Sequence, residues 1–285
     1  MPILEDSDLL NDLKFITRKS PRLFNKNYDY DYSGSVHIDL VGIMYLQDLY
    51  KNFYFIPLYL EIKYNTDVFI LPEIYESINN FLYKNKIIII PTEVEDSYYE
   101  ENTAHANLII INPKKKTIEI YDPNGNNGYT NELKQNVTTA VDLIQKRFRL
   151  QYSIIYIDHK INTKKIYGVY NEGYCMVCNV MYIEYTICNN NYFDYTNLFN
   201  FFMKNYPINK YTKIIIDPND DNDIDDVLEA DTEQRALITR VYIEYLYEYL
   251  RRLVLHDKNK YDGNINRFIK NTVINHYISM TRGSM

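Results

Sequence analysis

The sequence has no tryptophan, and it has only 3 cysteines in 285 residues. The cysteines, at positions 175, 178 and 188, lie too close together to cross-link a chain of this length. Their odd number leaves at least one thiol outside any disulfide, so we expect a reducing compartment. The missing tryptophan, together with 31 tyrosines, is typical of the amino-acid usage of an AT-rich genome and does not bear on mechanism.

Long apolar runs and a secretion signal are also absent. No stretch approaches the roughly 18 uninterrupted apolar residues of a membrane span, and residues 1–6 show no basic leader followed by an apolar segment. We therefore expect a soluble protein that is not secreted and that has no membrane as a partner. The net charge of −7 offers no overall basic field for a phosphate backbone, so no nucleic-acid partner is expected.

What is present is enough to fold. Apolar residues make up 46% of the chain and charged residues 24%, which indicates a sizeable core. We predict three parts: a polar N-terminal arm over residues 1–35, one main domain over 36–216, and an acidic linker with a helical extension packed on that domain over 217–285.

The apolar pattern predicts both helices and strands in the main domain. The spacing of apolar residues in 39–49 predicts a helix, and 53–62 reads as a strand that Pro57 restricts to a sheet edge. Residues 87–90 form a short, wholly apolar strand that ends at Pro91.

The second half of the chain is mostly helical by the same pattern. Residues 175–188 are apolar around almost the whole circumference of a helix and follow the helix breaker Gly173, which predicts a buried helix. Further helices are expected over 193–206, 232–255 and 265–278.

The sequence predicts a β-hairpin more clearly than any other feature of the chain. Residues 106–112 and 117–121 are β-rich runs joined by a four-residue loop. With an even loop, the numbers of paired residues sum to 229, so Ile111 lies opposite Ile118 and Ile109 opposite Ile120.

That register decides where the polar ends of the hairpin go. Because side chains alternate along a strand, His105, Asn107 and Asp122 share a face with the paired isoleucines. The isoleucines predict that this face is the core side. The polar residues at its ends are then expected to lie together where the core opens to solvent. His105 and Asp122 become diagonal neighbours about 7 Å apart at the backbone. An odd loop would put them on opposite faces.

Cys175 occupies the first turn of the predicted buried helix. The unpaired N–H groups and the dipole at a helix N-terminus favour a thiolate there. A buried cysteine is more often only a small core residue, and a lone histidine at a strand start is usually structural. A cysteine at a helix start together with His105 and Asp122 on one hairpin face is nevertheless the set that a nucleophile, a base and an orienting acid require.

These motifs resemble the SUMO-protease and adenovirus-protease superfamily of cysteine peptidases. The likeness lies in residues 105–110 (His-Ala-Asn-Leu-Ile-Ile), 117–125 (Thr-Ile-Glu-Ile-Tyr-Asp-Pro-Asn-Gly) and 173–175 (Gly-Tyr-Cys). It extends over about residues 40–205 and looks closest to members found in large DNA viruses. Its specific parts are the order His, acid, Cys and the 17-residue spacing between His105 and Asp122.

The resemblance implies an α+β fold, layered as in papain-like and adenovirus-protease-like cysteine peptidases, with a central buried helix packed on a mixed sheet. It implies cleavage of peptide or isopeptide bonds in a ubiquitin-like conjugate or a viral precursor, by Cys175, His105 and Asp122, with no cofactor and no metal. A viral member would act in the cytoplasm or nucleus of an infected cell, or be packaged in virions.

The chain departs from the family in two places. The family supplies a Gln a few residues before the nucleophile to stabilise the oxyanion, whereas here Gln151 is too far upstream and Asn171 is the nearest side-chain amide. Asn171 is therefore our oxyanion candidate. Many viral relatives also carry Trp where this chain has Cys178, a second thiol that competes with Cys175 or fills core.

Two other functions stay open on these residues. The same triad would serve an acetyltransferase, and the absent Gln would suit a protease fold that has become a binding module. The remaining motifs are weaker: a Cys175–Cys178 redox pair without a thioredoxin-like pattern, a calcium-like run over 217–225 that lacks the turn Gly and the final Glu, an Asp158–His159 dyad, and Gly125 and Gly128 without a phosphate-loop lysine.

Overall fold

The structure is a computed structural model. It describes residues 38–63, 67–96, 103–123, 131–157, 165–166, 169–170, 174–191 and 195–206, and the single positions 242, 245, 246, 249, 252–254, 256, 267–269, 271, 272, 274 and 275. The predicted N-terminal arm and acidic linker lie outside these residues, so the division into three parts stays a prediction.

A six-stranded mixed sheet forms the centre of the described part, as the predicted fold class requires. Its order is β1-β3-β4-β5-β6, with β2 also paired to β3. The strands β1 and β2 run parallel to β3, the strands β3, β4 and β5 are antiparallel, and β6 is parallel to β5. The bounds are β1 Phe53–Phe55, β2 Leu60–Lys63, β3 Ile87–Asp96, β4 Thr103–Asn112, β5 Thr117–Tyr121 and β6 Ser153–Ile157; β7 Lys165–Ile166 and β8 Val169–Tyr170 form a separate pair.

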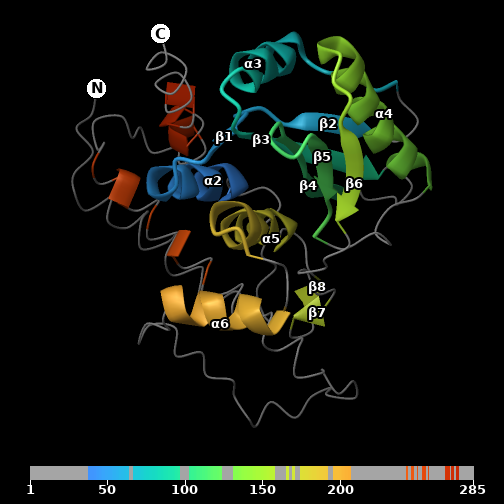
Figure 1. The fold of residues 1–285 in the computed structure, drawn as a ribbon. Coiled ribbons are helices and arrows are strands. Elements are labelled where there is room, and N and C mark those ends of the chain that lie inside the picture. Colours follow the sequence, from blue (N-terminus) through green and yellow to red (C-terminus); the bar gives the residue numbers. More distant parts are fainter. Residues whose placement is uncertain are drawn as a thin grey trace, which may run out of the picture.

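Helices cover both faces of this sheet (Figure 1). On one face α2, α5 and α6 pack against a core that includes Leu108 and Tyr121. On the other face α3 and α4 pack against a second core that includes Ile109 and Ile120. The helices are α2 Ile38–Leu49, α3 Pro72–Leu82, α4 Asn131–Phe148, α5 Tyr174–Tyr182 and α6 Tyr195–Asn205, and a π-helix, η1 Ile183–Cys188, follows α5 directly. No helix in the described ranges is long and apolar enough to cross a bilayer.

The two cores correct the prediction that the hairpin has a single core side. Ile109 and Ile111 face α3 and α4, while Leu108 and Ile110 face α2 and α5. A strand buried on both faces is apolar at every position, so the alternation of side chains does not single out one inner face.

Two predicted strand boundaries, at Pro57 and at Pro91, are wrong. Residues 53–62 are not one strand, because the chain leaves the ladder around Pro57 and β1 and β2 pair separately with β3 at the sheet edge. The strand β3 does not end at Pro91 but continues to Asp96. The register gives Pro91 no partner in β1 or β2, so its missing N–H costs no hydrogen bond on that side.

The predicted helices of the second half are present where the structure describes them. The helix expected over 175–188 begins at Tyr174 but winds as a π-helix from Ile183 onward. The described positions between 242 and 275 are helical, and several of them belong to the core beside α6. Tyr242 packs edge-on against Phe202 and Tyr206, and the Tyr249 hydroxyl donates to Asp48 Oδ2 at 2.6 Å.

Candidate active site

The hairpin register confirms the pairing predicted from the sequence and creates an open strand edge. The pairs run from Asn112–Thr117 to Leu108–Tyr121, and each pair sums to 229. The strand β5 ends at Tyr121, whereas β4 extends further, to Thr103, paired with β3 alone. Among the described strands, β4 therefore has no neighbour on its β5 side over residues 103–107.

His105 and Asp122 meet at this edge. His105 Nε2 lies 2.7 Å from Asp122 Oδ1, and the Asp122 side chain is buried. The His105 side chain retains 21% of its exposure, so the imidazole is reachable from solvent. The close approach of the two side chains, which the even loop predicted, is therefore present.

The helix α5 brings Cys175 to the same place. Cys175 is the second residue of α5, and its side chain is 5% exposed. The backbone N–H of Ala106 donates to Cys175 Sγ at 3.4 Å. Because β5 has ended, this N–H has no strand to pair with on that side and serves the sulfur instead. The helix start predicted for Cys175 is confirmed.

The electrostatics of His105 follow from these neighbours. Burial lowers the pKa of the imidazole, but the charge on Cys175 and the hydrogen bonds with Asp122 and Cys175 outweigh burial and raise that pKa to about 10. The ring therefore carries a positive charge at neutral pH. This charge faces the sulfur of Cys175 in the first turn of α5.

The other two cysteines have different surroundings. Cys178 is buried in the core formed by α2, α5 and α6, and Cys188 is half-buried at the end of η1. Burial, and then the charge of Glu184, raise the pKa of the Cys188 thiol well above its ordinary value. All three cysteines are thiols rather than disulfide partners. Among the described residues, it is the Cys175 sulfur that lies beside a histidine, His105.

Several sequence candidates lie outside the described residues. They are the oxyanion candidate Asn171, the helix breaker Gly173, the Asp158–His159 dyad, the glycines 125 and 128, and the calcium-like run 217–225. Within the described residues, no group of three or more His, Cys, Asp or Glu side chains is placed to hold a metal ion.

Sequence reasoning assigned no role to two groups at the site. The first is the Ala106 N–H, which could have been found only by asking where β5 stops relative to β4. The second is the side chain of Asn107, which shares the hairpin face of His105 and is buried, with neither amide atom hydrogen-bonded to another described group. A buried amide without a hydrogen-bond partner costs free energy, and the sequence had already placed Asn107 on the hairpin face of His105.

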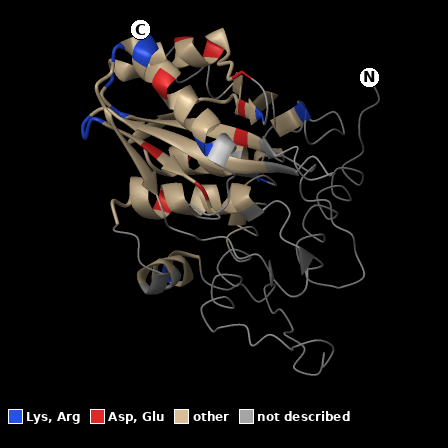
Figure 2. Ribbon diagram, turned by 90° about the vertical axis from the view of Figure 1, so that its right-hand side faces the viewer, with Lys and Arg blue, Asp and Glu red and all other residues tan. Residues whose placement is uncertain are grey.

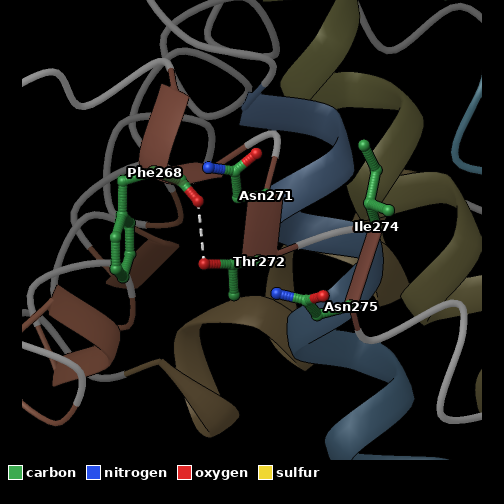
Figure 3. A pocket seen from close by; sticks show the side chains of 5 residues that line it. All are labelled: Phe268, Asn271, Thr272, Ile274 and Asn275. Carbon is green, nitrogen blue, oxygen red and sulfur yellow. Dashed lines mark hydrogen bonds between the residues drawn. The ribbon is translucent and has the colours of Figure 1, made fainter. Parts of the chain in front are cut away.

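A pocket elsewhere in the described part has a different character. Figure 3 shows it on the C-terminal helical residues, lined by Phe268, Asn271, Thr272, Ile274 and Asn275. The Thr272 hydroxyl donates to the Phe268 carbonyl oxygen at 2.8 Å, which occupies one of its few polar groups. None of the described lining residues is titratable, so these residues supply no acid or base to the pocket.

Comparisons with known proteins give only distant similarities. No family model matches the chain, and no curated protein matches it. Among solved structures, it is similar to the SUMO protease Ulp1 with the catalytic cysteine oxidised to a sulfinic acid (13% identity, TM-score 0.37) and to a sulfonic acid (12% identity, TM-score 0.38). Each comparison covers 86% of this chain and 98% of the other. Because these TM-scores are low, a function has to be inferred from the site's own geometry.

Proposed function

We propose that this chain is a cysteine peptidase in which Cys175 is the nucleophile, His105 the base and acid, and Asp122 the residue that orients His105. One observation carries the proposal. His105 lies between a carboxylate at 2.7 Å and a sulfur in the first turn of α5, and that sulfur accepts a backbone N–H from the neighbouring residue of β4. This is the arrangement from which a thiol can attack a carbonyl.

Acylation would proceed from the ion pair. With Nε2–H donating to Asp122, the Nδ1 atom of His105 is the nitrogen left to exchange a proton with Cys175. The thiolate attacks the carbonyl carbon of the scissile amide, and the carbonyl oxygen becomes an oxyanion. As the C–N bond breaks, His105 gives its proton to the leaving amine, and a thioester on Cys175 remains.

Deacylation would use the same imidazole in the opposite sense. His105, now neutral, takes a proton from a water molecule, whose oxygen attacks the thioester carbonyl. The C–S bond breaks, the acid product leaves, and the thiolate–imidazolium pair is restored. The partial exposure of His105 supports this step, because water has to reach the ring.

The oxyanion needs donors during both steps. The backbone N–H of Cys175 belongs to the first turn of α5, where N–H groups have no partner within the helix. We propose it as one donor and Asn171 as the second. If the Asn171 side chain serves, Asn171→Ala lowers kcat by roughly 100-fold or more; a loss below about threefold would leave the backbone as the main donor.

The substrate class rests on the motif resemblance rather than on the geometry. We propose a peptide or isopeptide bond in a ubiquitin-like conjugate or a viral precursor, cleaved in an infected cell. Transfer of an acetyl group would need the same three side chains, and a binding module would need none of them active. Acetyl-CoA binding separates the first alternative from a peptidase, and loss of thiol reactivity separates the second.

The test compares two neighbouring thiols. The wild-type chain, Cys175→Ala and Cys178→Ala are incubated with ubiquitin and SUMO carrying an electrophilic C-terminus, and with iodoacetamide at mildly acidic pH. We expect adducts on Cys175 in the wild type and in Cys178→Ala, and none in Cys175→Ala, because Cys175 lies beside His105 at the start of α5 whereas Cys178 packs into the core. Preferential labelling of Cys178 would refute the assignment.

A further inference from the structure

Five elements come together at one end of the main sheet: the strands β1, β3 and β6, the turn between β4 and β5, and the helix α4. The register pairs Phe53 with Ile87, Ile88 with Ile111, and Thr117 with both Asn112 and Ser153. The segments that precede β1, β3 and β6 and the turn between β4 and β5 therefore lie at one level. The C-terminus of α4 leads into this end through the short connection to β6.

These segments carry nine basic residues, which we call the basic rim. Figure 2 shows Lys and Arg, in blue, on the loops at one end of the sheet. Seven of the nine are exposed and two, Lys84 and Lys86, are partly buried. The members are Lys51, Lys84, Lys86, Lys114, Lys115, Lys116, Lys146, Arg147 and Arg149.

The described acids form no ion pair with the basic rim, although exposed Asp142 lies one helical turn before Lys146 in α4. None of the nine residues forms an ion pair with a carboxylate in the described part of the chain. Two acids at this end have other contacts: Asp48 accepts the Tyr249 hydroxyl, and Glu119 is buried and accepts the Thr117 hydroxyl. A positive surface therefore stands out on a chain whose net charge is −7.

Aromatic rings accompany the lysines. Tyr54 and Phe81 stack with ring centroids 4.4 Å apart, and the ammonium groups of Lys84 and Lys86 lie 5.1 Å and 5.0 Å from the centre of the Tyr54 ring. Tyr83, between α3 and Lys84, is 85% exposed. An exposed tyrosine among lysines suits a boundary between water and lipid, where its ring and its hydroxyl have different neighbours.

We infer that the basic rim docks the protein on a membrane surface rich in anionic lipids. Five strands at about 4.8 Å spacing make the rim about 19 Å wide, and α4 adds a second row about 10 Å from the sheet. A plane of headgroups can contact such a two-dimensional patch at once, because its segments end at one level. Clusters of 4 to 8 basic residues are what such surfaces bind, at roughly 1 kcal/mol for each residue near the surface.

The rest of the molecule is compatible with this orientation. At physiological salt a charge more than about 8 Å from the lipid plane is largely screened. His105 is seven residues along β4 from Asn112, so the candidate active site lies about 23 Å from the rim and stays open to substrate. This proposal departs from the expectation that the protein has no membrane partner, because the basic residues of the rim are scattered over about a hundred positions of the sequence.

The test uses the full chain and sedimentation with vesicles. Vesicles of phosphatidylcholine alone are compared with vesicles containing roughly 30 mol % phosphatidylserine at about 0.1 M salt. The rim variant carries Lys114→Gln, Lys115→Gln and Lys116→Gln on the exposed turn. The control variant carries Lys63→Gln, Lys134→Gln and Lys204→Gln, which change the net charge equally but lie outside the rim.

We expect the wild type to bind only the anionic vesicles, the rim variant to bind them about 100-fold more weakly, and the control variant to bind like the wild type. Cleavage by the rim variant in solution should be unchanged, because the turn is far from Cys175. Equal losses in both variants, or no sedimentation of the wild type, would overturn the proposal. So would tighter binding to a DNA duplex or to polyglutamate than to the vesicles.

Discussion

His105 and Asp122 are joined by a 2.7 Å contact between Nε2 and Oδ1, although Asp122 lies beyond the last residue of β5. One step beyond the Leu108–Tyr121 pair, the register sets Asp122 opposite Asn107, so Asp122 reaches His105 diagonally, two positions further along β4. The carboxylate therefore takes one ring nitrogen and leaves the other for Cys175. The strand register therefore brings Asp122 within reach of the His105 ring.

The first prediction concerns the carboxylate. Asp122→Asn should preserve the fold and lower kcat/KM by roughly 100-fold or more, because an amide can hold the ring in the wrong tautomer and cannot stabilise its cation. The measurement is kcat/KM on the best available substrate, with circular dichroism to check folding. Asp142→Asn, on the exposed face of α4, is the matched control and should have wild-type activity.

The alternative interpretation is that Asp122 acts only as a turn former before Pro123, a role that asparagine fills equally well. If Asp122→Asn has the kcat/KM of the wild type, the carboxylate acts only in the turn. The site would then be a Cys–His dyad.

The second prediction concerns the charge on His105. Burial lowers its pKa, and the largest effect that raises it is the charge on Cys175. In Cys175→Ala that effect and one hydrogen bond are lost, so the pKa of His105 should fall clearly below the value of about 10 in the wild type. Titration of the imidazole proton signals by NMR checks this, with Cys178→Ala as the control that should leave the titration unchanged. If the titration of His105 is unchanged in Cys175→Ala, Cys175 does not influence the pKa of His105 and the prediction is wrong.

The hairpin shows how far the sequence could predict the site. An even loop and the alternation of side chains fix the register, and the register places His105 beside Asp122. The start of α5 was predictable because Gly173 interrupts the pattern before Cys175. Local sequence was sufficient in both cases, since each depends on spacing within about 20 residues.

What the sequence could not predict depends on contacts between distant segments. The second core face became visible only when α3 and α4 were placed on the sheet. The passage of β3 through Pro91 depends on the gap between β1 and β2, which are more than 25 residues earlier in the chain. The Ala106 N–H donates to the sulfur of Cys175 because α5, nearly 70 residues later in the chain, packs beside the part of β4 that β5 does not cover.

The third prediction concerns the contact that seats α5. Gly42, in α2, lies so close to α5 that a Cβ atom there would be 2.6 Å and 2.7 Å from the two methyl carbons of Val180. Alanine favours a helix over glycine by about 1 kcal/mol, but Val180 is fully buried and overpacking costs about 1 to 3 kcal/mol. We expect Gly42→Ala to lower the free energy of unfolding.

The double variant Gly42→Ala/Val180→Ala identifies the cause. It removes the methyl groups that the new Cβ would strike, so it should be more stable than the sum of the two single changes predicts. Urea denaturation of the four proteins gives this coupling energy. If Gly42→Ala is more stable than the wild type, helix propensity decides the effect and the two helices can move apart.

The fourth prediction concerns Glu184, a carboxylate of η1 that is 1% exposed. The Tyr206 hydroxyl donates to its Oε1 at 2.5 Å and the Tyr50 hydroxyl at 3.4 Å. Burial raises the pKa of Glu184 more than the hydroxyls of Tyr206, Tyr242 and Tyr50 lower it, so the folded pKa is above the ordinary value of 4.5. The folded protein therefore binds this proton more tightly than the unfolded chain does.

The sign of the effect on stability follows. As pH rises from 4.5 through the folded pKa, the carboxyl group ionises at a cost to the fold, so wild-type stability falls over this window. Glu184→Gln keeps an oxygen that can accept from Tyr206 but has no proton to lose. The difference in free energy of unfolding, variant minus wild type, should therefore increase with pH above 4.5 and then level off. Urea denaturation at several pH values between about 4 and 8 measures it. A difference that stays constant or decreases with pH would mean that the carboxylate is stabilised, not penalised, by its buried position.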